Sequence, residues 1–179
     1  MPLFYSEALR RIAEVFIHDN GKVHVMSNTR CGHTSMRKYF GFMDLLTPEE
    51  ANWSKWINST SRRVVVLRNP IDRWKSAEVF MNISWFKHIG PKNGMDKDTF
   101  LRVHREPFLI NISRDISFEI IPFENLSDYL PWGNRTIPSD VHISEVDIDV
   151  SMEEEITQYQ YFRKNCKVIG PEEWKQLTP

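Results

Sequence analysis

Three short segments of the chain carry the strand patterns of the sequence. Lys22 to Ser27 alternates and is rich in valine, Val64 to Leu67 is a continuous apolar run, and Ser117 to Pro122 is a shorter third segment. Alternation is typical of a strand with one buried face, and a continuous apolar run is typical of a strand that is covered on both faces. We expect these segments to form a central, mostly parallel sheet.

Helix patterns alternate with these strands. Thr34 and Ser35 open a helix that carries Met36, Tyr39 and Phe40 inward, and Asn69-Pro70 starts another after the second strand. Helices are also predicted at Ser6–His18, Thr47–Ile57 with Trp53, Trp56 and Ile57 facing the core, Asp98–Val103, Glu124–Tyr129 and Met152–Asn165. Asn20-Gly21 indicates a turn. The strand–loop–helix order predicts an α/β fold with helices on both faces of the sheet.

Length and composition predict one domain over residues 1–179, with 41% hydrophobic and 26% charged residues. The net charge of −1 gives no general electrostatic reason to bind nucleic acid. No segment approaches eighteen apolar residues, so no membrane span is expected. Cys31 and Cys166 form neither a disulfide framework nor a metal cluster, which favours a reducing, cytoplasmic compartment.

Six glycosylation sequons raise the alternative of secretion. They begin at Asn52, Asn58, Asn82, Asn111, Asn125 and Asn134. The chain begins at Met1 without a membrane anchor, so we interpret the sequons as chance matches.

The loop between the first strand and its helix has the chemistry of an anion site. Loop amides and the first N–H groups of a helix lack intrahelical partners, and the helix dipole favours negative charge there. Arg30 adds a fixed cation, and Thr34 and Ser35 add hydroxyls. A phosphorylated ligand is therefore expected. The pattern of an ordinary ATPase is absent, because no Gly-Lys precedes Thr34.

A second interpretation of the same loop is a cysteine-dependent phosphatase. Cys31 and Arg37 have the C-x5-R spacing of those enzymes, and a helix N-terminus lowers the pKa of a thiol. Such loops, however, carry His before the Cys and Gly at the third position after it, where this chain has Arg30 and Thr34.

The second strand is followed by a basic segment. Arg68 comes at its carboxyl end, where open α/β sheets bind ligands, and Ser76 follows eight residues later. Arg73 and Lys75 lie between them. The simplest interpretation of this segment alone is a strand followed by a basic, solvated helix.

Together the two segments resemble the sulfotransferases that use PAPS (3′-phosphoadenosine-5′-phosphosulfate), the carbohydrate sulfotransferases in particular. The family loop P-K-x-G-[ST]-T-[SN] corresponds to Thr29-Arg30-Cys31-Gly32-His33-Thr34-Ser35. The family motif R-[DN]-P-x-x-R-x-x-S is matched fully by Arg68-Asn69-Pro70-Ile71-Asp72-Arg73-Trp74-Lys75-Ser76. Weaker similarities are His104-Arg105-Glu106-Pro107 and the late strand at 118–126, so the resemblance covers about residues 22–130. Arg30 and His33 depart from the usual Lys and from the usual Ser or Gly.

The resemblance implies a P-loop-like three-layer fold and transfer of a sulfuryl group from PAPS to a hydroxyl of a small-molecule or carbohydrate acceptor, leaving PAP (3′,5′-diphosphoadenosine). It implies that Arg30, Cys31, Gly32, His33, Thr34 and Ser35 hold the 5′ end of the cofactor. Arg68 and Ser76 would hold the 3′-phosphate, and Arg30 would replace a metal ion as the fixed cation.

The general base is less determined by the resemblance. His104 and His33 are the histidine candidates, and Asp44, Glu49, Glu50 and Glu78 are the carboxylate candidates. A nucleotide-binding protein without catalysis is the remaining alternative.

Overall fold

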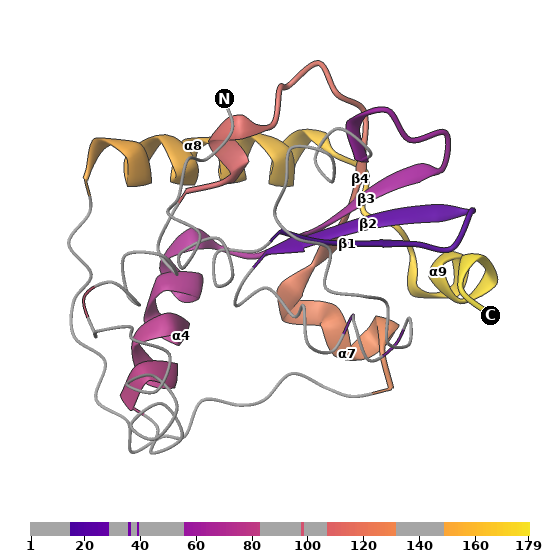
Figure 1. The fold of residues 1–179 in the computed structure, drawn as a ribbon, viewed down its shortest axis with the longest axis horizontal. Helices are drawn as coiled ribbons and strands as arrows, with labels where there is room; N and C mark the ends of the chain where they lie inside the picture. Colours follow the sequence, from indigo (N-terminus) through magenta and orange to yellow (C-terminus); the bar gives the residue numbers. More distant parts are fainter. Residues whose placement is uncertain are drawn as a thin grey trace.

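A computed structural model describes residues 15–28, 36, 39, 56–82, 98, 107–131 and 149–179 (Figure 1). Its strands are β1 (Val15–Asp19), β2 (Val23–Asn28), β3 (Arg62–Leu67) and β4 (Glu119–Pro122). Its helices are α4 (Pro70–Asn82), α7 (Leu126–Tyr129), α8 (Val150–Asn165) and α9 (Pro171–Leu177), with 3-10 turns η2 (Leu109–Asn111) and η3 (Phe123–Asn125).

The strands form one sheet in the order β1-β2-β3-β4. β2, β3 and β4 run parallel, with Val25 opposite Val64 and Val65 opposite Ile120. β1 pairs antiparallel with β2 at the sheet edge. The predicted α/β class and parallel sheet are therefore confirmed, and the three predicted strands lie within two residues of β2, β3 and β4.

The parallel strands are buried on both faces, as a continuous apolar run requires. Val65 and Leu67 belong to one core cluster, which includes Phe162 of α8. Val64 and Val66 belong to a second cluster, which includes Tyr129 of α7 and Trp174 of α9. Because successive side chains of a strand point to opposite faces, α8 covers one face of the sheet and α7 and α9 cover the other (Figure 1).

The predicted helix at Ser6–His18 is wrong over its last residues, because β1 begins at Val15. Val15, Phe16 and Ile17 are β-branched or aromatic residues that suit a strand, and pairing with β2 satisfies their backbone groups. Residues 6–14 lie outside the described part.

The predicted turn at Asn20-Gly21 follows β1 directly. Asn20 Oδ1 accepts hydrogen bonds from two successive amides, and Gly21 adopts φ 84°, a conformation that glycine tolerates.

Several predicted core positions are confirmed. Met36 is buried in the cluster with β2 and β3, and Tyr39 packs against its rim. Trp56 is buried on the opposite face and donates from Nε1 to the carbonyl oxygen of His24 at 3.1 Å. Phe40, Trp53 and the predicted helix start at residues 47–50 lie outside the described residues.

The last two helices continue the chain around the sheet. α8 confirms the predicted helix and begins two residues earlier, with Asp149 as its N-cap, accepting from the amide of Met152 at 2.9 Å. α9 was missed, although Pro171 occupies its first turn as helix starts favour. Among the described residues, no helix is long and apolar enough to cross a membrane.

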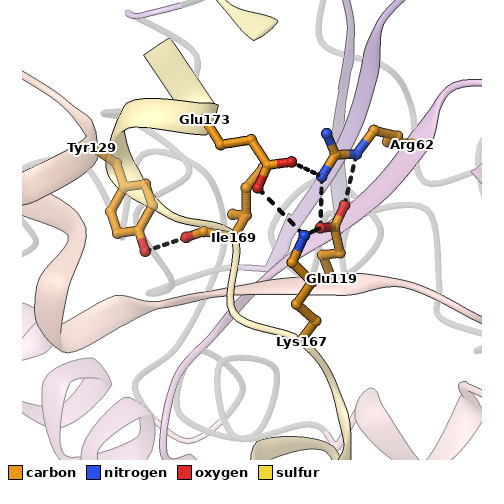
Figure 2. Close-up of polar contacts among 6 residues, drawn as sticks. All are labelled: Arg62, Glu119, Tyr129, Lys167, Ile169 and Glu173. Atoms are coloured by element: carbon orange, nitrogen blue, oxygen red, sulfur yellow. Dashed lines mark hydrogen bonds and ion pairs between the residues drawn. The ribbon is translucent and has the colours of Figure 1, made fainter. Parts of the chain in front are cut away.

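The segment between α8 and α9 is bonded to β4. The amide of Ile120 donates to the carbonyl of Lys167 at 2.9 Å, and the amide of Ile169 donates back to Ile120 at 3.1 Å. Figure 2 shows two further connections. Tyr129 Oη donates to the Ile169 carbonyl at 2.6 Å, and an ion-pair network joins Arg62 and Lys167 to the carboxylates of Glu119 and Glu173.

Candidate active site

The two motif segments begin at one edge of the sheet. β2 ends at Asn28, directly before residues 29–35, and β3 ends at Leu67, directly before Arg68. β2 and β3 are parallel neighbours, so their carboxyl ends lie side by side. β4 ends at Pro122 on the other side of β3, and Phe123 follows it. The carboxyl ends of the three parallel strands therefore lie side by side along one end of the sheet.

Much of the predicted site falls outside the described residues. This is true of the cofactor loop and of most candidates for catalysis: Arg30, Cys31, Gly32, His33, Thr34, Ser35, Arg37, Asp44, Glu49, Glu50 and His104. Their roles stay predictions. Met36, the first described residue after the loop, is buried against the face of the sheet that α7 and α9 cover.

Arg68 is held by an aromatic ring. Its guanidinium carbon lies 4.1 Å from the centroid of the Phe123 ring, a cation–π contact between the ends of β3 and β4. The side chain of Arg68 is only partly buried, and Phe123 packs against the core cluster beneath it. A stacked guanidinium keeps its N–H groups in the plane of the fork, where an oxyanion can accept them. The position and the contact both suit anion recognition.

Ser76 occupies a buried position of α4. Asn69 caps this helix by accepting the Ile71 amide at 2.9 Å, and Pro70 begins it, as predicted. The helix is not the solvated one that its basic residues indicate: Arg73 and Trp74 are at most 1% exposed, and Ser76 is 5% exposed. α4 packs against α8, which accounts for the difference.

Arg73 has a role that the sequence did not indicate. It lies near Glu155 of α8, whose carboxylate accepts the amides of Leu109 and Ile110 at 3.0 and 3.1 Å. Burial raises the pKa of Glu155 above its ordinary value, and the positive charge of Arg73 opposes that rise. The second arginine of the motif therefore compensates a buried charge between α4, α8 and η2. Glu155 stands in the run Glu153-Glu154-Glu155, whose pattern does not single it out.

Ser27 adds an unexpected polar group at the end of β2. It is fully buried, and its hydroxyl oxygen has no hydrogen-bond partner among the described residues. A buried hydroxyl ordinarily finds a partner, because burying one without compensation costs about 1–3 kcal/mol. Ser27 lies two residues before residues 29–35, the predicted cofactor-binding segment. The carboxyl end of β2 therefore carries a hydroxyl that can accept or donate a hydrogen bond.

Glu78 is the one candidate base within the described residues. It lies on α4, two residues after Ser76, and is 9% exposed. In the part of the chain that the structure describes, no three His, Cys, Asp or Glu side chains gather as a metal site would require.

Searches among protein families, curated proteins and solved structures found no match for this chain. The site must therefore be interpreted from its own residues.

Proposed function

We propose that the protein is a PAPS-dependent sulfotransferase with a P-loop-like three-layer fold. The observation that carries the proposal is the position of the two motifs. Each follows the carboxyl end of a strand, and the two strands are parallel neighbours. In open α/β sheets such an edge is where ligands bind. Two phosphate-binding segments side by side suit a nucleotide that carries phosphate groups at both its 3′ and 5′ positions.

The described residues fit the 3′ end of this cofactor. Arg68 offers a guanidinium fixed on the Phe123 ring, and Ser76 offers a hydroxyl on the helix that starts beside it. The hydroxyl of Ser27, without a partner in the described part of the chain, is available to the 5′ side. When bound, PAPS would supply the activated sulfuryl group.

The catalytic work of the chain itself is electrostatic. The acceptor oxygen would bond to sulfur as the bond from sulfur to the bridging oxygen broke, so negative charge would collect on the bridging oxygen. Arg30 and the amides of residues 32–35 would stabilise the charge, as fixed donors do in phosphoryl transfer. The acceptor hydroxyl passes its proton to a base, for which His104, His33 and Glu78 are the candidates.

The test is isothermal calorimetry of the wild-type chain with PAP, AMP and ATP, because it needs no knowledge of the acceptor. PAP should bind most tightly, since AMP and ATP lack the 3′-phosphate. Equal affinity for PAP and AMP would overturn the proposal.

A second measurement distinguishes a sulfotransferase from a cysteine-dependent phosphatase. Cys31→Ser should abolish hydrolysis of an aryl phosphate if Cys31 is a nucleophile, yet leave PAP binding within about threefold if the loop only cradles the cofactor.

A further inference from the structure

A pocket of about 650 Å³ lies at the opposite end of the sheet from the proposed cofactor site. Its walls come from the amino ends of β3 and β4 and from the carboxyl end of α8, which Figure 1 shows beside them. The residues that line it include Arg63, Arg114, Ser61, Ser117, Tyr161 and Asn165. The volume is within the range of about 300–1,000 Å³ that small-molecule sites occupy.

The pocket is positively charged although the chain is not. Among its described lining residues, Arg62, Arg63, Arg114 and Lys167 are cationic and Glu119 is the one carboxylate. Glu119 is neutralised by Arg62 at 2.6 Å and by Lys167 at 3.2 Å. The two remaining arginines therefore determine the charge that a ligand meets.

Arg63 and Arg114 are fixed without carboxylate partners among the described residues. Arg63 donates to the backbone carbonyls of Ser117 at 3.0 Å and Ile57 at 2.9 Å. Arg114 donates from Nε to Gln158 at 3.0 Å and stacks on Tyr161, with 4.1 Å from its guanidinium carbon to the ring centroid. Neither set of contacts uses all the N–H groups of its arginine. Both guanidinium groups line the same pocket, are held in place, and keep N–H groups that these contacts do not use. An oxyanion is the group that such guanidinium groups bind.

The rest of the lining is rich in neutral hydrogen-bonding groups. Ser61, Ser117 and Asn165 contribute hydroxyls and an amide, and Tyr161 contributes a ring. Burial raises the pKa of the nearby Cys166 thiol, which therefore adds no negative charge. Hydroxyls and amides pair with the hydroxyls of a polyol.

We propose that this pocket binds a small polyol carrying one phosphate or sulfate ester, of the class of sugar phosphates and sugar sulfates. The oxyanion meets Arg63 and Arg114, and the hydroxylated body meets Ser61, Ser117 and Asn165. The pocket is a second site, independent of the proposed sulfotransferase function.

Calorimetry with four probes tests the proposal: glucose 6-phosphate, glucose 6-sulfate, glucose and inorganic phosphate. One or both esters should bind at least tenfold more tightly than glucose and than phosphate, and the preferred ester identifies the anion. Saturating PAP should leave this affinity unchanged. The proposal would be overturned if neither ester bound, or if glucose or inorganic phosphate bound as tightly as the esters. Displacement of the ester by PAP would also overturn it.

Variants of pocket residues test whether the sugar ester binds in this pocket. Arg114→Gln should weaken ester binding about tenfold, because it removes a charge-assisted contact, and Arg114→Lys should weaken it less. Arg163→Gln is the matched control, since Arg163 lies on the same helix as Tyr161 and pairs with Glu124 outside the pocket; it should change affinity less than twofold. Melting temperatures verify that each variant is folded. Unchanged ester affinity in folded Arg114→Gln would refute the site.

Discussion

Three arginines show how the surroundings of a charged side chain determine what it can contact. Arg68 and Arg114 each stack on an aromatic ring at 4.1 Å, at opposite ends of the sheet. Arg73, by contrast, is 1% exposed and lies near the buried carboxylate of Glu155. In the two proposals, Arg68 and Arg114 would each bind an external anion, whereas Arg73 lies in the interior. Two arginines of one nine-residue motif therefore lie in different surroundings.

Arg68→Ala should weaken binding of PAP about ten- to a hundredfold, because charge-assisted hydrogen bonds contribute about 1.5–3 kcal/mol and 1.4 kcal/mol is a factor of ten. Binding of AMP should change much less, since AMP lacks the 3′-phosphate. Calorimetry with both nucleotides measures the ratio. Arg114→Ala is the matched control, because it removes an equivalent stacked arginine elsewhere. An unchanged ratio in a folded Arg68→Ala protein would remove the 3′-phosphate assignment.

Glu155 predicts an unusual pH dependence of stability. Burial raises its folded-state pKa above the ordinary value of 4.5, so the folded protein takes up the proton first as the pH falls. Relative to Glu155→Gln, the wild type should gain free energy of unfolding as the pH falls through the raised pKa, and the gain should level off below about pH 4.5. For each pH unit that separates the folded-state pKa from the unfolded one, the gain is about 1.4 kcal/mol. Urea denaturation between pH 4 and 8 measures it.

The exposed neighbour Glu154 provides the control for that series. Glu154→Gln should change the free energy of unfolding by less than about 0.5 kcal/mol, as is usual for an exposed substitution. If the advantage of the wild type over Glu155→Gln instead grew with rising pH, the attraction of Arg73 would outweigh burial, and the direction given for the pKa of Glu155 would be wrong.

At the scale of elements, α9 connects the C-terminal end of the chain to Tyr39, which follows the predicted cofactor-binding residues 30–35 in the sequence. Trp174 is fully buried between the Tyr39 and Tyr129 rings, with ring centroids 6.0 and 6.4 Å away. The Tyr39 hydroxyl also bonds to Thr178, at 2.8 Å to Oγ1. A helix of seven residues has little stability of its own, so α9 depends on these contacts and supplies part of the core in return.

Trp174→Ala should lower the free energy of unfolding by about 3–5 kcal/mol, the usual cost of removing a buried aromatic side chain. Gln176→Ala, on the exposed face of the same helix, should change it by less than about 0.5 kcal/mol. Urea unfolding monitored by far-UV circular dichroism compares the two. A loss below about 1 kcal/mol for Trp174→Ala, well under the usual cost, would mean that α9 is not part of the core.

At the scale of the whole molecule, the sequence predicted those elements that a local pattern of residues indicates. The parallel strands were recognisable because Val64–Leu67 is uniformly apolar and turn residues bound it. β1 was mistaken because Phe16 continues the helical spacing of Leu9, Ile12 and Ala13, and its strand identity depends on pairing with β2. The two strands form a hairpin across Asn20-Gly21, a turn signal that also favours a strand before the turn.

The candidate site divides in the same way. The places of Arg68 and Ser76 followed from the strand end and the helix start. The Phe123 ring under Arg68 and the carboxylate of Glu155 near Arg73 were not predictable, because they come from segments about 50 and 80 residues further along the chain. The amino-end pocket likewise combines β3, β4 and α8.

The two proposed sites predict two separate footprints in hydrogen exchange. PAP should slow amide exchange at the carboxyl edge, in peptides covering residues 26–35 and 67–76, because its phosphates would meet the strand ends there. The preferred sugar ester should slow exchange at residues 59–63, 114–119 and 161–167, the walls of the pocket. Mass spectrometry with each ligand alone and with both measures this, and the combined footprint should be the union of the two. The Arg68→Ala and Arg114→Gln proteins are reciprocal controls, each losing one footprint and keeping the other. Protection of residues 59–63 and 114–119 by PAP would instead place the nucleotide at the amino end of the sheet, against the motifs that assigned it to the carboxyl edge.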